Sequence, residues 1–185
     1  YERSVTDPLT GIANTRRLNQ ELERRIESAA AGAGRFALFA IDLDNFKQVN
    51  DRFDHRTGDA VLAAVGEALS AQADSGDVVA RRGGDEFSVL TPAGDDRDLE
   101  EFSGRLRRAI AAARKRVCPS VSPSGSVGYA ISQPGDSPES VKARADAALH
   151  GLALLEADLL GAVGTSDVDV ARGHVQLDSV LEARI

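Results

Sequence analysis

The sequence is poor in cysteine and has no long hydrophobic run, and each shortage excludes a class of protein. Cys118 is the only cysteine, so no intrachain disulfide can form, and we expect a reducing compartment. No apolar stretch reaches the roughly 18 residues needed to cross a bilayer, and no signal-peptide pattern occurs. We therefore expect no membrane contact by this segment and a cytoplasmic location, alone or as the cytoplasmic part of a membrane-attached protein.

Basic runs with interleaved aromatic residues are also lacking. The net charge is −7 and aromatic residues make up 4%, which excludes polymeric nucleic acid as a partner but is compatible with a nucleotide carried by a divalent metal. The 185 residues, 42% of them hydrophobic, suffice for one globular domain with its own core. Because the chain opens at Tyr1 without a methionine, we expect a flanking sensory or effector domain outside this sequence.

Hydrophobic periodicity predicts helices and strands in mixed order, which indicates an α+β sheet covered by helices. In the short helix near 45–53, Phe46 and Phe53 lie on one face that should be buried. The tail 163–185 alternates apolar residues and is assigned to a C-terminal hairpin or a linker to a further domain, apart from a domain at 1–162. Helices are expected at about 15–30, 45–53, 59–71, 98–117 and 137–160, and strands at 35–44, 78–90 (a hairpin) and 124–132.

Acidic residues occur where two of these strands end or turn. In VVARRGGDEFSVL a glycine pair provides the positive φ angles of a tight turn, and Asp85 and Glu86 follow it. The apolar run FALFAI ends in Asp42 and Asp44. Alone, turn acids are mostly solvated, and Asp42 is equally well explained as a strand-end or N-cap acid. If the strands pair, Asp42 and Asp85 converge, and two carboxylates with phosphate oxygens and water suit Mg²⁺.

The helix after the buried strand carries a second polar group. Asn50 lies beside the apolar face, and a buried amide needs a partner, which is either the backbone or a ligand. Asp59 is close in sequence, and an amide with a carboxylate matches the donors and acceptors on the edge of guanine. Lys47, near the start of the helix, is placed to meet a phosphate.

Four motifs, DPLTGIANTRR, IDLDNFKQVNDRFDHRTGD, ARRGGDEFSVL and SGSVGYA, occur in this order. Over about residues 6–150 the chain therefore resembles the GGDEF domain of diguanylate cyclases. The resemblance implies a nucleotide-cyclase-like α+β fold with a mainly antiparallel central sheet, a ferredoxin-like core and surrounding helices. It also implies that two GTP are condensed into cyclic di-GMP with release of pyrophosphate, in a homodimer in which each domain holds one GTP.

The resemblance assigns roles to particular residues. Mg²⁺ or Mn²⁺ would be held by Asp42, the backbone carbonyl of Leu43 and Asp85. The residues implied in catalysis are Asp85, Glu86 and Lys47. Those implied in binding the substrate are Asn50 and Asp59 at guanine, and Asp44, Asn45, Phe46 and Lys47 at the phosphates.

The sequence departs from the family's pattern in places that matter for function. Asp74 stands where an arginine of the inhibitory product site is usual, so no such site is expected. In the last helix, Ala153 and Ala157 replace a lysine and an arginine that reach the phosphates, and His150 replaces a tyrosine. We interpret the histidines as surface or packing residues. Asp54 replaces a glycine and is expected to tolerate the left-handed region.

Two functions of different classes therefore stay open. The first is an active diguanylate cyclase, because the metal and guanine residues are all present. The second is a degenerate GGDEF module that binds GTP and regulates an adjoining domain such as a cyclic di-GMP phosphodiesterase, because the phosphate-binding cations are missing. A purely structural dimerisation domain would not need Asp42, Asn50, Asp59 and Asp85 together.

Overall fold

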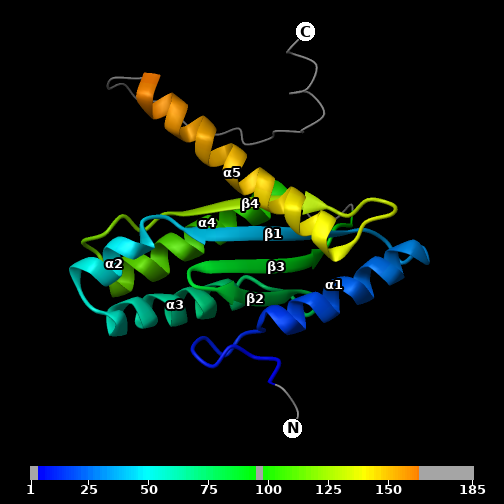
Figure 1. The fold of residues 1–185 in the computed structure, drawn as a ribbon, viewed down its shortest axis with the longest axis horizontal. Helices are drawn as coiled ribbons and strands as arrows, with labels where there is room; N and C mark the ends of the chain where they lie inside the picture. Colours follow the sequence, from blue (N-terminus) through cyan, green and yellow to red (C-terminus); the bar gives the residue numbers. More distant parts are fainter. Residues whose placement is uncertain (1–3, 95–97, 163–185) are drawn as a thin grey trace.

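The structure is a computed structural model that describes residues 4–94 and 98–162, with side-chain surroundings described as far as Gly151. The four-stranded sheet has the order β2-β3-β1-β4, and every pairing in it is antiparallel (Figure 1). The α+β fold expected from the sequence is confirmed. Along the chain the elements are α1 (Thr15–Ala30), β1 (Phe36–Leu43), α2 (Phe46–Arg52), α3 (His55–Ser70), β2 (Val78–Gly83), β3 (Glu86–Pro92), α4 (Leu99–Val117), β4 (Gly125–Ile131) and α5 (Pro138–Ala162).

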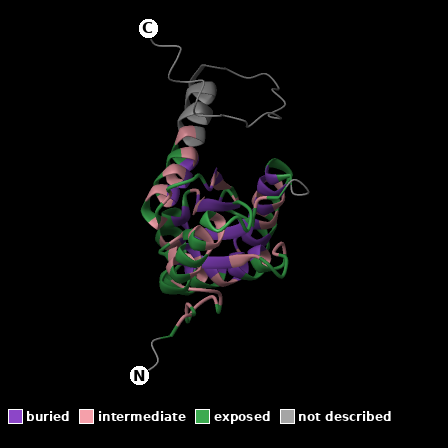
Figure 2. Cartoon of the chain, turned by 90° about the vertical axis from the view of Figure 1, so that its right-hand side faces the viewer, coloured by how far each residue is buried: buried purple, intermediate pink, exposed green. Residues whose placement is uncertain are grey.

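Strand β1 is the centre of the fold and is buried on both faces. Its side chains alternate between two hydrophobic clusters, because successive residues of a strand point to opposite faces. Phe39 and Ile41 pack into the cluster formed with α3 and α4, whereas Leu38 and Ala40 pack into the cluster formed with α1 and α5. The sheet therefore forms a buried middle layer between two pairs of helices (Figure 2). This arrangement explains the uninterrupted apolar run in the sequence.

The segment between α2 and α3 differs from the sequence prediction. Helix α3 begins at His55, earlier than the predicted 59, because the carboxylate of Asp54 accepts a hydrogen bond from the backbone N–H of Thr57 at 2.7 Å and caps the helix. Asp54 is extended, with φ −158°, so the expected left-handed conformation is wrong. Phe53 is 49% exposed rather than buried, because α2 ends at Arg52 and the apolar face does not continue.

Several element boundaries agree with the sequence prediction. The boundaries of α1 and α4 and the hairpin of β2 and β3 are confirmed within a few residues. The tail 163–185, for which a hairpin or linker is expected, lies outside the described residues. Among the described helices, none combines the length and the apolar character that crossing a bilayer requires.

Gly128 of β4 lies directly against the backbone of helix α5. A Cβ atom at this position would lie 2.1 Å from the backbone nitrogen of Leu149 and 2.6 Å from the carbonyl carbon of Ala148. These are backbone atoms, so the whole helix would have to move away. The absence of a side chain at Gly128 therefore sets how α5 sits on β4.

Replacing Gly128 with alanine is expected to lower the free energy of unfolding by about 1–3 kcal/mol or more, because α5 is displaced. Thermal unfolding followed by circular dichroism measures this loss. Gly151→Ala in the same helix is the matched control, because a Cβ there meets no atom within 4 Å. That variant should be neutral or slightly stabilised. Equal stability of the two variants would contradict the close approach of α5.

Candidate functional site

Two strand ends converge where β1 leaves the sheet. In the register of β1 and β3, Asp42 lies opposite Glu86. The backbone N–H of Leu43 donates to the carbonyl of Asp85, with 3.3 Å between nitrogen and oxygen. The structure therefore brings Asp42 and Asp85 together, as the sequence predicts. We call the carboxylates at this sheet end the acid cluster, and its members are Asp42, Asp44, Asp85 and Glu86.

The hairpin turn depends on its two glycines. Gly83 has φ 141° and Gly84 has φ 52°. Residues other than glycine rarely adopt these backbone conformations. The sequence prediction of positive φ angles at this pair is confirmed. The turn delivers Asp85, which is partly buried, and Glu86, which is exposed, beside the end of β1.

The acid cluster gathers negative charge around a partly buried carboxylate, that of Asp42. Burial is the largest cause that raises the pKa of Asp42, and the negative charges of Asp85, Glu86 and Asp44 add to it, so that together they bring this pKa to about 6. The charge of His150 acts in the opposite direction, so this exposed histidine is close enough to influence the site. The interpretation of His150 as a surface or packing residue missed this effect.

The turn from β1 to α2 is held from the side of β4. The backbone N–H of Asp44 donates to the carbonyl of Ser124 at 3.2 Å, and its carboxylate accepts from the hydroxyl of Ser126 at 2.8 Å. Asn45 follows with φ 55° and is the one non-glycine residue in the described part of the chain with positive φ. Asn45 thus lets the chain reverse immediately after Asp44, a role that the sequence alone did not indicate.

Helices α2 and α3 bring the proposed guanine-binding residues close together. Phe46 and Val49 are buried and fix α2 on the core. The Oδ1 atom of Asn50 would lie only 2.0 Å from a Cβ added at Gly58, so the amide is packed against the first turns of α3. Asp59 is the next residue and is exposed. Glycine at position 58 is thus what allows Asn50 this close approach.

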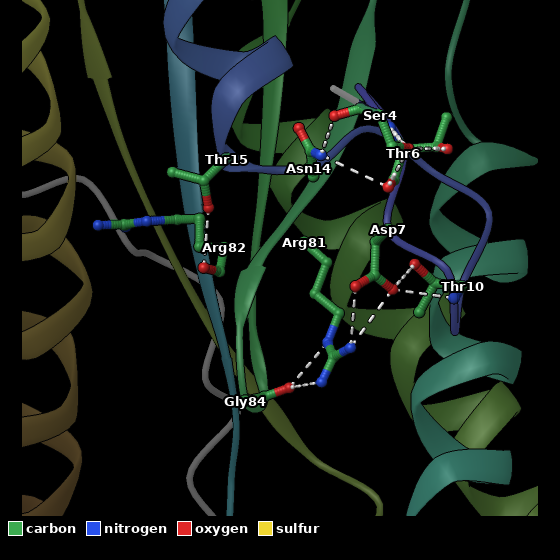
Figure 3. A network of polar contacts seen from close by, with 9 residues as sticks. All are labelled: Ser4, Thr6, Asp7, Thr10, Asn14, Thr15, Arg81, Arg82 and Gly84. Carbon is green, nitrogen blue, oxygen red and sulfur yellow. Dashed lines mark hydrogen bonds and ion pairs between the residues drawn. The ribbon is translucent and has the colours of Figure 1, made fainter. Parts of the chain in front are cut away.

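The glycine turn is also clamped by Arg81, one of its neighbours in the hairpin (Figure 3). The Nε and Nη2 atoms of Arg81 donate to the carbonyl of Gly84 at 3.0 and 2.8 Å. Its Nη1 atom pairs with Asp7 at 3.1 Å. Burial alone would raise the pKa of Asp7, but hydrogen bonds from Thr10 and the charge of Arg81 outweigh it and lower the pKa. The N-terminal segment therefore supports the turn that carries Asp85.

Arg82 connects the same hairpin to the helices on the other face of the sheet. Its guanidinium forms a forked pair with Asp146 of α5, with distances of 2.6 and 3.1 Å, and its carbonyl accepts from the hydroxyl of Thr15 at the start of α1. Arg81 and Arg82 therefore fix the hairpin from two sides. Sequence reasoning did not assign roles to these arginines because their partners are distant in the chain.

The tetrapeptide that begins at Asp74 borders a hollow of about 460 Å³. Arg105 of α4 also lines it, and its guanidinium lies 5.1 Å from the centre of the Phe102 ring. The sequence argument considered only position 74 and missed this arginine, which the fold brings in from another element. Acidic side chains still predominate around the hollow, and they are Asp74, Asp77, Asp98 and Glu101.

The described side chains would supply only some of the ligands of a metal ion. Within residues 4–94 and 98–151, no three His, Cys, Asp or Glu side chains are gathered closely enough to hold an ion. The donors that converge are the carboxylates of Asp42 and Asp85 and the nearby backbone, all hard oxygens of the kind that Mg²⁺ prefers. These residues fit a metal whose remaining ligands come from phosphate and water. Lys47 is exposed on α2, and Ala153 and Ala157 lie beyond the described side chains.

Comparison with known proteins identifies the family of this chain. The family described as "Diguanylate cyclase, GGDEF domain" matches residues 4–153. The diguanylate cyclase DgcP of Pseudomonas aeruginosa is 36% identical over 155 residues, which is 80% of this chain and 22% of that protein. The bifunctional diguanylate cyclase/cyclic di-GMP phosphodiesterase MucR of the same species is 36% identical over 149 residues, 80% of this chain and 22% of that protein.

A solved structure shows the same fold. The coiled coil and GGDEF domain of DgcB from Caulobacter crescentus, in complex with c-di-GMP, matches with a TM-score of 0.70 and 30% identity. The match covers 81% of this chain and 81% of that one. This chain spans about a fifth of the length of DgcP and MucR, both of which are much longer proteins.

Removing the Arg81 clamp should loosen the turn that carries Asp85. Arg81→Ala is expected to lower the free energy of unfolding by about 1–3 kcal/mol, because charge-assisted hydrogen bonds to Gly84 and Asp7 are lost. Urea denaturation measures the change. Arg24→Ala is the control, because its pair with Glu21 involves an arginine side chain that is 63% exposed and should cost at most about 1 kcal/mol. If both substitutions lower the free energy of unfolding by the same small amount, the contacts of Arg81 do not stabilise the turn.

The raised pKa of Asp42 predicts how stability depends on pH without added metal. The folded protein binds a proton at Asp42 up to about pH 6, whereas the unfolded chain releases it near 3.8. Folding therefore becomes less favourable as pH rises through this interval. Asp42→Asn cannot ionise, so its stability relative to wild type should increase from pH 4 to pH 7. Denaturation curves at several pH values measure the difference in unfolding free energy between variant and wild type. A difference that does not change with pH would contradict the raised pKa of Asp42.

Proposed function

Because the chain belongs to the GGDEF domain family of diguanylate cyclases, we propose that it condenses two GTP into cyclic di-GMP and releases pyrophosphate. The observation that carries the proposal is the convergence of Asp42 and Asp85 at one end of the sheet. Burial, and after it the charges of the neighbouring carboxylates, raise the pKa of Asp42, and a cation at this position would offset both effects. The reaction would take place in a homodimer in which each domain holds one GTP.

The residues of the acid cluster would have two roles at the phosphates, metal binding and proton acceptance. Asp42, the carbonyl of Leu43 and Asp85 would hold Mg²⁺ or Mn²⁺, which neutralises phosphate charge during the displacement. The 3′-hydroxyl of one GTP forms a bond to the α-phosphorus of the other, and the bond between that phosphorus and pyrophosphate breaks. Glu86 is exposed beside Asp85 and would help to accept the hydroxyl proton.

The remaining residues would bind and orient the nucleotide. Asn50, held against Gly58, and the exposed carboxylate of Asp59 would recognise guanine, since an amide and a carboxylate match its donors and acceptors. Lys47 and the turn formed by Asp44, Asn45 and Phe46 would face the phosphates. The surface near Asp74 is expected not to bind cyclic di-GMP tightly, because its acids repel phosphate. We expect the domain to act in the cytoplasm beside a further domain.

A second function is favoured by one specific observation. Ala153 and Ala157 stand where a lysine and an arginine would meet the phosphates, so GTP binding without turnover is the alternative. Such a module would regulate an adjoining domain, for example a cyclic di-GMP phosphodiesterase. The similarity to the bifunctional protein MucR makes this arrangement reasonable.

The experiment that separates these functions is incubation of the protein with GTP and Mg²⁺, followed by chromatography for cyclic di-GMP and pyrophosphate. Product formation supports the cyclase, and GTP binding by calorimetry without product supports the regulatory module. Asp85→Asn should abolish metal-dependent turnover, or binding in the second case. Asp51→Asn, an exposed residue of α2 with no assigned role, is the matched control and should behave like wild type. Unchanged GTP affinity and activity in Asp85→Asn would refute the site.

Guanine selectivity should depend on the space at Gly58. A Cβ there displaces the amide of Asn50, since only 2.0 Å separates the two positions. Gly58→Ala is therefore expected to reduce the preference for GTP over ATP by roughly tenfold, which corresponds to the loss of about one hydrogen bond to the base. Calorimetric titration with both nucleotides measures the ratio. The affinity for ATP is the internal control, and an unchanged ratio would show that Asn50 does not read the base.

A further inference from the structure

Arg114 is a charged residue inside the fold that the proposed reaction does not use. It lies on α4, is 1% exposed and is the largest fully buried side chain in the part of the chain that the structure describes. Its Nη1 atom donates to the carbonyl of Ser124. The same carbonyl accepts the backbone N–H of Asp44, so Arg114 and the acid cluster share a hydrogen-bond acceptor.

A buried guanidinium needs compensation that Ser124 alone does not provide. Transfer of a charge out of water is costly unless opposite charge and hydrogen bonds replace the solvent. The Nη2 atom of Arg114 is buried and has no hydrogen-bond partner, and no direct ion pair of Arg114 occurs within the described part of the chain. Its compensation must therefore come from negative charges nearby that do not touch it.

The acid cluster provides this negative charge. Burial lowers the pKa of Arg114, and the charges of Asp44, Cys118 and Asp85 oppose the lowering. Asp44, the largest of these charges, and Asp85 both belong to the acid cluster. Asp44 is held at the shared carbonyl of Ser124, and Asp85 is bonded to the neighbouring Leu43. Arg114 and the acids are thus joined through one short stretch of backbone around Ser124.

We propose that Arg114 is an internal counter-cation of the acid cluster, which lets the carboxylates assemble before a metal ion arrives. The proposal rests on the proposed function in that the acid cluster is taken to be the metal site. Arg114 and the metal then neutralise the same carboxylates from two sides, the protein interior and the solvent. Because each reduces the charge that the other meets, the two effects are coupled and oppose each other.

This coupling distinguishes a counter-cation from a residue that only fills space. If Arg114 contributes packing and one hydrogen bond, its loss destabilises the protein equally with and without metal. If it neutralises the acid cluster, its loss lowers the stability most when no metal is present, because a bound cation replaces part of the missing charge. The metal-induced stabilisation must then be larger in a variant without the charge.

The test compares thermal unfolding of wild type and Arg114→Gln, each with and without MnCl₂ and without nucleotide. The variant should melt at a lower temperature than wild type when no metal is present. Its rise in melting temperature on adding Mn²⁺ should exceed the wild-type rise by about 2–4 °C, the shift expected for a modest coupling in a domain of this size. An equal or smaller rise in the variant would overturn the proposal.

Three control variants separate charge from packing. Arg114→Lys keeps the charge and should show the wild-type rise with Mn²⁺. Arg116→Gln removes an exposed arginine of the same helix, which pairs only loosely with Glu67 at 3.7 Å, and should also show the wild-type rise. Ile110→Val removes a methyl group from the buried face of α4 and should lower the melting temperature equally with and without Mn²⁺.

A double-mutant cycle with Asp44→Asn tests the proposal independently of any metal. Arg114→Gln should lower the free energy of unfolding by less in the Asp44→Asn variant than in wild type, because one of the carboxylates that needs the cation is gone. The cycle also applies if Arg114→Gln alone does not fold, since the double variant is then expected to recover folding. If wild type shows no Mn²⁺ response, the proposed metal site fails, and the cycle still decides on Arg114. If the two substitutions change the free energy of unfolding additively, Arg114 is not a counter-cation of the acid cluster.

Discussion

The pairing of β1 with β3 is the constraint on which the rest of the structure depends. Its register places Asp42 opposite Glu86, and a shift by one residue would turn the buried side chains of β1 toward the wrong face. Because β1 is buried on both faces, this register is fixed by the core. The hydrophobic packing in the middle of the sheet therefore determines where the carboxylates at its end must lie.

The acid cluster is unfavourable in isolation, and the fold holds it together with arginines from different elements. Arg81 fixes the turn before Asp85 and is itself oriented by Asp7. Arg82 pairs with Asp146 and so connects the hairpin to α5, and Arg114 donates to the carbonyl of Ser124. Hydrogen bonds to backbone carbonyls are prominent in this arrangement, so the carboxylates stay available for a cation. The clustered carboxylates thus lower the stability of the domain, while the proposed chemistry requires them.

Much of the fold was predictable from the sequence because its signals are local. The apolar run of β1 and the glycine pair identified the central strand and the hairpin, and both are confirmed. The errors fall where local signals compete. Asp54 caps a helix instead of adopting a left-handed turn, and Phe53 is exposed because α2 ends one residue earlier. Short helices are ended by caps and turns, which periodicity does not register.

The sequence by itself determined the family, the elements and the candidate residues, because residue types and spacings carry that information. Only the tertiary structure decided which distant groups meet. The pairs of Arg81 with Asp7 and of Arg82 with Asp146 join residues that are 74 and 64 positions apart, a separation that says nothing of their distance in the fold. Such contacts follow from how helices pack on a sheet, where burial of apolar surface sets the geometry and polar groups adapt to it.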